Sequence, residues 1–140
     1  IKINDLRLLI DDLWFLIDDL ESTVMKEQIK DRTKKIGIAI IFLIEKLPST
    51  VSSRAIANQI VRSGTSIGAN YRAACRAKSR ADMINKLKIV EEESDETIYW
   101  LEIMEETNLI SKEFTKELKN ELNEILAIIV SSIKTLRKQI

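Results

Sequence analysis

The chain contains almost no residues that break helices. One proline, Pro48, and three glycines are spread over 140 residues. The stretches between them are rich in Leu, Ile, Glu, Lys and Ala, which favour helix. All-β and loop-rich folds use far more glycine and proline than this. The sequence therefore predicts an all-α protein, and its length suits a single domain.

Apolar residues recur at three- and four-residue steps in four successive stretches, as in helices that bury one face. Four amphipathic helices with short connections predict an antiparallel up-and-down four-helix bundle. The expected boundaries are a stop at Pro48, a cap at Ser52 or Ser53, a capping box at Ser79 and Asp82, an end at Asn108 and a cap at Ser111. The expected buried stripe of the first helix is Ile29, Thr33, Ile36, Ile40, Leu43 and Leu47.

Residues 1–24 precede these four stretches and carry a heptad repeat. Ile at position a and Leu at position d are typical of a coiled-coil seam. We expect an additional N-terminal amphipathic helix, from about Asn4 to about Ser22, that packs on the bundle or on its copies in neighbouring subunits. The repeat consists of Ile3, Ile10 and Ile17, of Leu6, Leu13 and Leu20, and of Asp5, Asp12 and Asp19 facing outward, with Leu9, Leu16, Trp14 and Phe15 widening the apolar face.

Met25 stands where a start codon would place it. We therefore interpret residues 1–24 as an appended or engineered fusion helix and residues 25–140 as the four-helix bundle. The alternative is a natural N-terminal extension.

The net charge is zero, but the charges are segregated along the chain. Residues 54–90 hold eight basic side chains and one acidic one, whereas residues 91–107 hold eight acidic side chains and no basic one. Such asymmetry favours partner binding or self-association through complementary patches. The alternative is a helix pair whose opposite charges neutralise each other.

Two glycines stand four residues apart in the stretch RSGTSIGAN, residues 62–70. A phosphate-binding P-loop requires a different pattern after a strand, so this stretch does not predict one. Gly64 and Gly68 would lie on one face of the second helix, where each costs about 1 kcal/mol relative to alanine. We expect them to form a thin face against another helix or another subunit.

Basic side chains follow the glycines. Arg72, Arg76 and Arg80 would form one column if the helix continued that far, with Lys78 and Lys86 beside it. Such a column can contact successive phosphates of RNA or DNA. The alternative is a solvated face whose charges are paired with acids.

Glu91 interrupts the apolar stripe expected for the third helix, between Leu87 and Ser94. A carboxylate in that place needs a partner. Arg62, on the facing helix, is the candidate. A buried pair of this kind would fix the helix register more than it would stabilise the fold.

The composition does not favour an enzyme. The chain has no histidine, which is the commonest acid–base group and metal ligand. Cys75 therefore has no histidine to activate it, and the acidic run near Glu91 lacks the E-x-x-H pairs of carboxylate metal bundles. We expect no catalytic, cofactor or metal site and no small-molecule substrate. One cysteine and no apolar stretch long enough for a membrane span favour a cytoplasmic protein.

Residues 60–104, IVRSGTSIGANYRAACRAKSRADMINKLKIVEEESDETIYWLEIM, carry a specific resemblance. The run RSGTSIGAN followed by EEESDETIYWL resembles the bacterial four-helix-bundle family encoded in 23S rRNA intervening sequences, over residues 25–140. The resemblance implies a homo-oligomeric ring, a pentamer. It also implies distant similarity to the accessory protein of diversity-generating retroelements, which binds nucleic acid through a basic surface. Two functions follow as expectations: a nucleic-acid-associated accessory protein, or a purely structural oligomeric scaffold.

Overall fold

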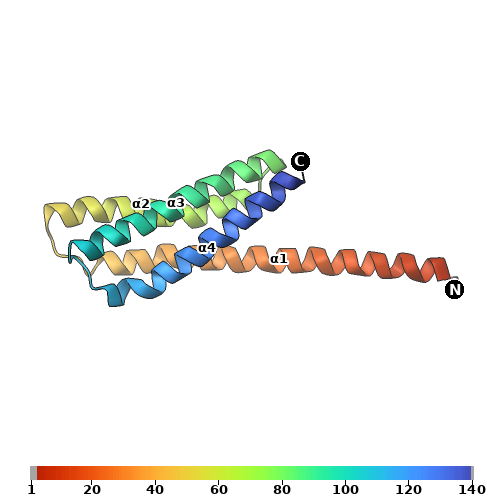
Figure 1. The fold of residues 1–140 in the computed structure, drawn as a ribbon, viewed down its shortest axis with the longest axis horizontal. Helices are drawn as coiled ribbons and strands as arrows, with labels where there is room; N and C mark the ends of the chain where they lie inside the picture. Colours follow the sequence, from red (N-terminus) through yellow and green to blue (C-terminus); the bar gives the residue numbers. More distant parts are fainter. Residues whose placement is uncertain (1–2, 140) are drawn as a thin grey trace.

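The structure, a computed structural model, describes the backbone of residues 3–139 and the side chains of residues 12, 13, 16, 17 and 19–139. Within residues 3–139 it contains four helices: α1 (Ile3–Ile44), α2 (Val51–Cys75), α3 (Arg80–Glu106) and α4 (Lys112–Lys138). Each helix runs antiparallel to the next (Figure 1). The prediction of an all-α up-and-down bundle is confirmed.

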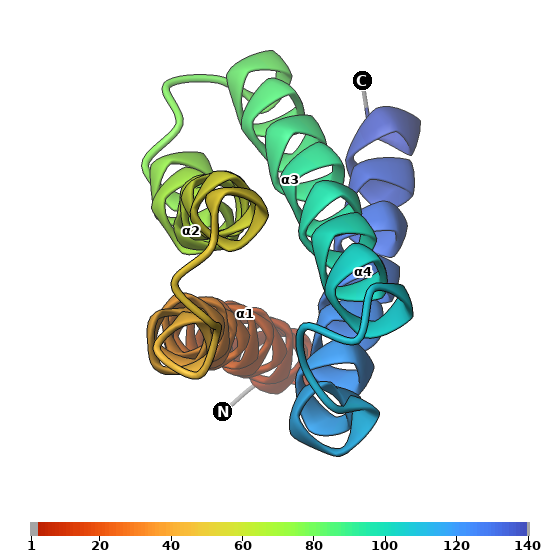
Figure 2. The same cartoon turned by 90° about the vertical axis from the view of Figure 1, so that its left-hand side faces the viewer.

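The four helices pack as neighbours around one core. α2 packs on α1 and α3, and α4 packs on α3 and α1. Viewed along the bundle, α1 and α2 occupy one half and α3 and α4 the other (Figure 2). The stripe expected on α1 lies in the core, where Ile36 and Ile40 are at most 2% exposed. Full burial of one such side chain contributes about 1.5–3 kcal/mol.

Hydrogen bonds to side chains mark the starts of the helices. Ser79 accepts a hydrogen bond from the Asp82 amide at 3.1 Å, which confirms the cap at Ser79. The Asp82 carboxylate reaches back to the Lys78 amide, one residue before the position that the capping box predicts. Ser111 caps α4 as expected, and Asn108 adopts a left-handed conformation with φ of 57° just after α3. The cap expected at Ser52 or Ser53 is wrong. α2 begins at Val51, and its cap is Thr50, two residues before Ser52; Thr50 accepts the hydrogen bond from the Ser53 amide at 3.2 Å.

The first two helices approach each other closely at the glycines. A Cβ atom built at Gly68 would lie 3.2 Å from the Lys34 nitrogen and from the Thr33 carbonyl carbon, both in the α1 backbone. A Cβ atom at Gly64 would overlap the end of the Ile40 side chain. The thin face formed by the two glycines therefore meets α1 within the same chain.

The N-terminal segment is helical but is not a separate helix. It is the first part of α1, which runs without interruption because no glycine or proline lies between Ile3 and Lys35. This part projects beyond the end of the bundle (Figure 1). Leu13, Leu16 and Leu20 are 57%, 63% and 64% exposed, so the expected packing of this segment on its own bundle is wrong.

Packing of the segment on neighbouring copies stays a prediction. Asp12 and Asp19 are exposed, as expected. The other expected positions lie outside the described side chains: Ile3, Asp5, Leu6, Leu9, Ile10, Trp14 and Phe15. Among the residues that the structure describes, no helix has the length and apolar character needed to cross a membrane.

Candidate nucleic-acid interface

The basic column expected along α2 does not exist as one column. α2 ends at Cys75, so Arg72 lies in its last turn and Arg76 is its C-terminal cap. Lys78 lies in the link to α3, and Arg80 is the first residue of α3. The chain reverses direction across this link, so Arg80 cannot continue the spacing of Arg72 and Arg76.

Arg80 instead contacts the end of α4. Its guanidinium Nη1 donates a hydrogen bond to the Gln139 carbonyl oxygen at 2.6 Å. Gln139 caps α4, whose last turn carries Arg137 and Lys138. We call the resulting group, Lys78, Arg80, Arg137 and Lys138, the basic end of the bundle. Figure 1 shows the start of α3 beside the C-terminus.

The charges of the basic end are free to meet an external anion. All four side chains are exposed. Within the described part of the chain, none of them has a carboxylate within ion-pair distance. The nearby acid is Asp82, whose carboxylate accepts a hydrogen bond from the Lys78 backbone amide at 3.3 Å. Four unpaired cations on one end of a bundle suit contact with phosphates.

The sequence analysis did not place Arg137 and Lys138 in this group. The signal was available in the topology. In an up-and-down bundle the end of the fourth helix and the start of the third lie at the same end.

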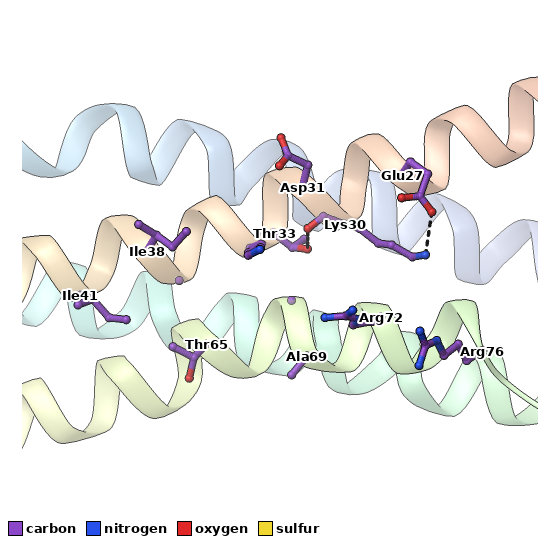
Figure 3. Close-up of a pocket in the computed structure, with 13 residues that line it drawn as sticks. Glu27, Lys30, Asp31, Thr33, Ile38, Ile41, Thr65, Ala69, Arg72 and Arg76 are labelled. Carbon is purple, nitrogen blue, oxygen red and sulfur yellow. Dashed lines mark hydrogen bonds and ion pairs between the residues drawn. The ribbon is translucent and has the colours of Figure 1, made fainter.

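Arg72 and Arg76 line a groove between α1 and α2 of about 480 Å³ (Figure 3). Lys34 of α1 lines it too, and none of these three has an ion-pair partner among the described residues. The acids of the groove are already paired, Glu27 with Lys30 at 2.9 Å and Asp31 with Lys35 at 2.7 Å. Lys86 is half-buried further along α3.

The predicted pair between Arg62 and Glu91 is wrong. Arg62 is half exposed and pairs with Glu93, at 3.4 Å, and with Glu96. The buried positions of α3 include Val90, Ser94 and Thr97, so Glu91 lies one residue away from the buried stripe. It faces a groove toward α4. Burial raises the pKa of Glu93, and Arg62 offsets this rise only in part.

Two further groups of polar contacts join α4 to α1 and to α3. Arg32 of α1 pairs with Glu121 and with Glu124, the latter at 2.5 Å. Arg32 holds the pKa of Glu121 below its usual value. Glu105 of α3 accepts a hydrogen bond from the Thr115 hydroxyl at 2.6 Å and lies 3.3 Å from the Lys119 nitrogen.

The described residues include no group of three or more His, Cys, Asp or Glu side chains that could hold a metal ion. The acidic side chains Glu91, Glu92 and Asp95 instead line a groove with Leu126 and Val130 of α4.

Comparison with known proteins identifies relatives of this bundle. The family model described as 23S rRNA-intervening sequence protein matches residues 25–131. The chain is also similar to the crystal structure of a protein of unknown function from the S23 ribosomal protein family of Bacteroides thetaiotaomicron. The two share 40% sequence identity and a TM-score of 0.72, over 78% of this chain and 97% of that one. No curated protein matches the chain.

Proposed function

The chain belongs to the 23S rRNA-intervening sequence protein family, and on that premise we propose that it is a non-enzymatic, ring-forming protein that binds nucleic acid through its basic end. The observation that carries the proposal is the meeting of Arg80 with the last turn of α4, which adds Arg137 and Lys138 to Lys78. Phosphate contacts of this kind position a protein on RNA or DNA without reading its sequence.

The local structure supports an anion at this place. Arg80 begins α3, and the N-terminus of a helix carries a partial positive charge that favours anions. No aromatic side chain belongs to the basic end, so stacking on bases is not expected. The proposal therefore concerns the phosphate backbone, and it predicts similar affinity for RNA and DNA of the same length.

Fluorescence anisotropy with a labelled RNA hairpin and a labelled DNA hairpin tests the proposal. Arg80→Gln and Arg137→Gln each remove one cation that would meet a phosphate. Each variant should therefore bind both probes more weakly, and its slope of log K against log salt should be smaller by about one. Lys116→Gln is the matched control, because Lys116 is exposed on α4 and lies outside the basic end. Equal binding by all three variants would reject the basic end as the binding site. No binding by the unaltered chain would leave the purely structural scaffold as the function.

A further inference from the structure

The chain presents two complementary charged faces on opposite halves of the bundle. One is the groove between α1 and α2, with unpaired Lys34, Arg72 and Arg76. The other is the outer face of α3, on the opposite half (Figure 2). Residues of that face recur at three- and four-residue steps and are all exposed: Glu92, Asp95, Tyr99, Glu102 and Glu106.

The acidic side chains on the outer face of α3, like the basic side chains of the groove, are not used in ion pairs within the described part of the chain. Glu93 and Glu96 pair with Arg62, and Glu105 pairs with Lys119. The acids of the outer face have no ion-pair partner among the described residues. One basic side chain, Lys88, lies on α3 four residues before Glu92 and lines the neighbouring groove with Glu92 and Asp95, without an ion pair to either.

Each face also carries apolar surface that the chain itself leaves uncovered. Tyr99 is 52% exposed in the middle of the acidic face. Ile38 and Ile41 line the α1/α2 groove and are each 44% exposed. Partly exposed apolar side chains ringed by charge are typical of protein–protein contact surfaces, and tyrosine is enriched among the residues that anchor them.

We infer that the α1/α2 groove receives the outer face of α3 from a second copy of this chain. Tyr99 of the second copy packs on Ile38 and Ile41, and its Glu92 and Asp95 meet Lys34 and Arg72. The charge complementarity identifies the occupant, since the same molecule carries both faces and has no net charge. The two faces differ, so the contact is head-to-tail and repeats from copy to copy, as in a ring.

This contact leaves Lys78, Arg80, Arg137 and Lys138 free, because none of them lines the groove. The inference deepens the self-assembly included in the proposed function and does not depend on nucleic-acid binding. Loss of RNA binding in the Arg80→Gln variant with unchanged assembly would concern the basic end alone.

Charge reversal with mixing tests the contact. One variant, K34E/R72E, has an acidic groove, and the other, E92K/D95K, has a basic α3 face. Light scattering should give a mass well above 16.1 kDa for the unaltered chain and about 16.1 kDa for each variant alone. Mixing the two variants should give a species heavier than either variant alone, because the acidic groove of one variant meets the basic face of the other, and the basic groove the acidic face. Two variants that must alternate cannot fill a pentameric ring without one like-charged contact, so the test is the gain in mass and not the return of the native subunit count. K112E/K116E, on the exposed start of α4, is the control and should assemble normally.

Three outcomes would overturn the inference: an unaltered chain that is monomeric, variants that assemble alone, or a mixture that stays monomeric. If the K34E/R72E variant lost RNA binding but kept the oligomeric mass of the unaltered chain, nucleic acid would occupy the groove instead of a second copy. Zero-length carbodiimide cross-linking of the unaltered chain gives a second readout that does not depend on the folding of a variant. It should join Lys34 of one copy to Glu92 or Asp95 of another. If mass spectrometry of the digested, cross-linked protein found no peptide pair joined at these residues, the contact would be rejected.

Discussion

Gly68 of α2 packs directly against the backbone of Thr33 in α1, since a Cβ atom at Gly68 would lie 3.2 Å from the Thr33 carbonyl carbon. Backbone atoms cannot move aside as a side chain can. Thr33 is fixed further by its hydroxyl, which donates to the Ile29 carbonyl oxygen at 2.8 Å. The glycine spacing in the sequence thus sets the distance between the first two helices.

Larger residues at this contact should destabilise the bundle. Gly68→Leu and Gly64→Leu should each lower the free energy of unfolding by about 1–3 kcal/mol through overpacking. Gly37→Ala is the control, because its added Cβ would meet atoms of Thr65 at an ordinary 3.5 Å. It should be neutral or stabilising by up to about 1 kcal/mol, from helix propensity. Urea denaturation measures all three, and unchanged stability in both leucine variants would contradict the account.

The cap of α2 gives a second comparison. Thr50→Ala removes the hydrogen bond to the Ser53 amide and should cost about 1 kcal/mol. Ser52→Ala, two residues away and exposed, should change the thermal midpoint little. The reverse order of effects would show that Ser52 caps the helix.

The contact between Arg32 and Glu121 should make stability depend on pH. The pKa of Glu121 is lowered in the folded state, so its contribution is present above the unfolded pKa and is lost as pH falls through the folded pKa. Both side chains are about a third exposed, so Arg32→Met should cost only about 0.5–1 kcal/mol at neutral pH. Urea denaturation of the unaltered chain and of Arg32→Met, at neutral pH and near pH 2, gives the difference between their free energies of unfolding. A difference that is as large near pH 2 as at neutral pH would contradict a stabilising contact between Arg32 and Glu121.

Glu105 offers a more buried test, with a side chain that is 7% exposed. Burial raises its pKa, but the hydrogen bond from Thr115 and the contact with Lys119 offset this, and the pKa stays below its usual value. Thr115→Val should raise the pKa of Glu105 and cost about 1–3 kcal/mol at neutral pH. NMR titration of the Glu105 carboxyl follows the shift. A pKa that does not rise would show that burial and Lys119 alone set its value.

The projecting part of α1 can be removed to test its role. The buried part of α1 begins at Ile29, so deletion of residues 1–24 should leave a folded bundle with the same subunit count. Circular dichroism and light scattering check both statements. An unfolded product or a changed mass would show that this segment belongs to the assembled fold.

Much of the fold could be predicted because local patterns determine it. The stripe that includes Ile36 and Ile40 is set by helical spacing, and Ser79 and Ser111 act as caps through amides two or three residues away. The cap of α2 could not be chosen in this way. Thr50, Ser52 and Ser53 are all good capping residues, and only the path of the chain after Pro48 selects Thr50.

The candidate site depends on contacts that the sequence does not encode locally. Arg80 and Gln139 are distant along the chain and meet only because the helices alternate in direction. The predicted partner of Arg62 was wrong because one residue of helical phase separates Glu91 from the buried stripe. The pairing of Arg32 with Glu121 joins the first and last helices and had no local signal.

The salt dependence of RNA binding, measured for the unaltered chain and for the double variant R80Q/R137Q, tests most directly whether the basic end contacts phosphates. The basic end predicts a steep fall of log K with log salt for the unaltered chain. It also predicts a slope that is smaller by about two for the double variant, one for each phosphate contact removed. Equal slopes for the two proteins, or affinity of the unaltered chain that salt leaves unchanged, would contradict binding of nucleic acid at this end of the bundle.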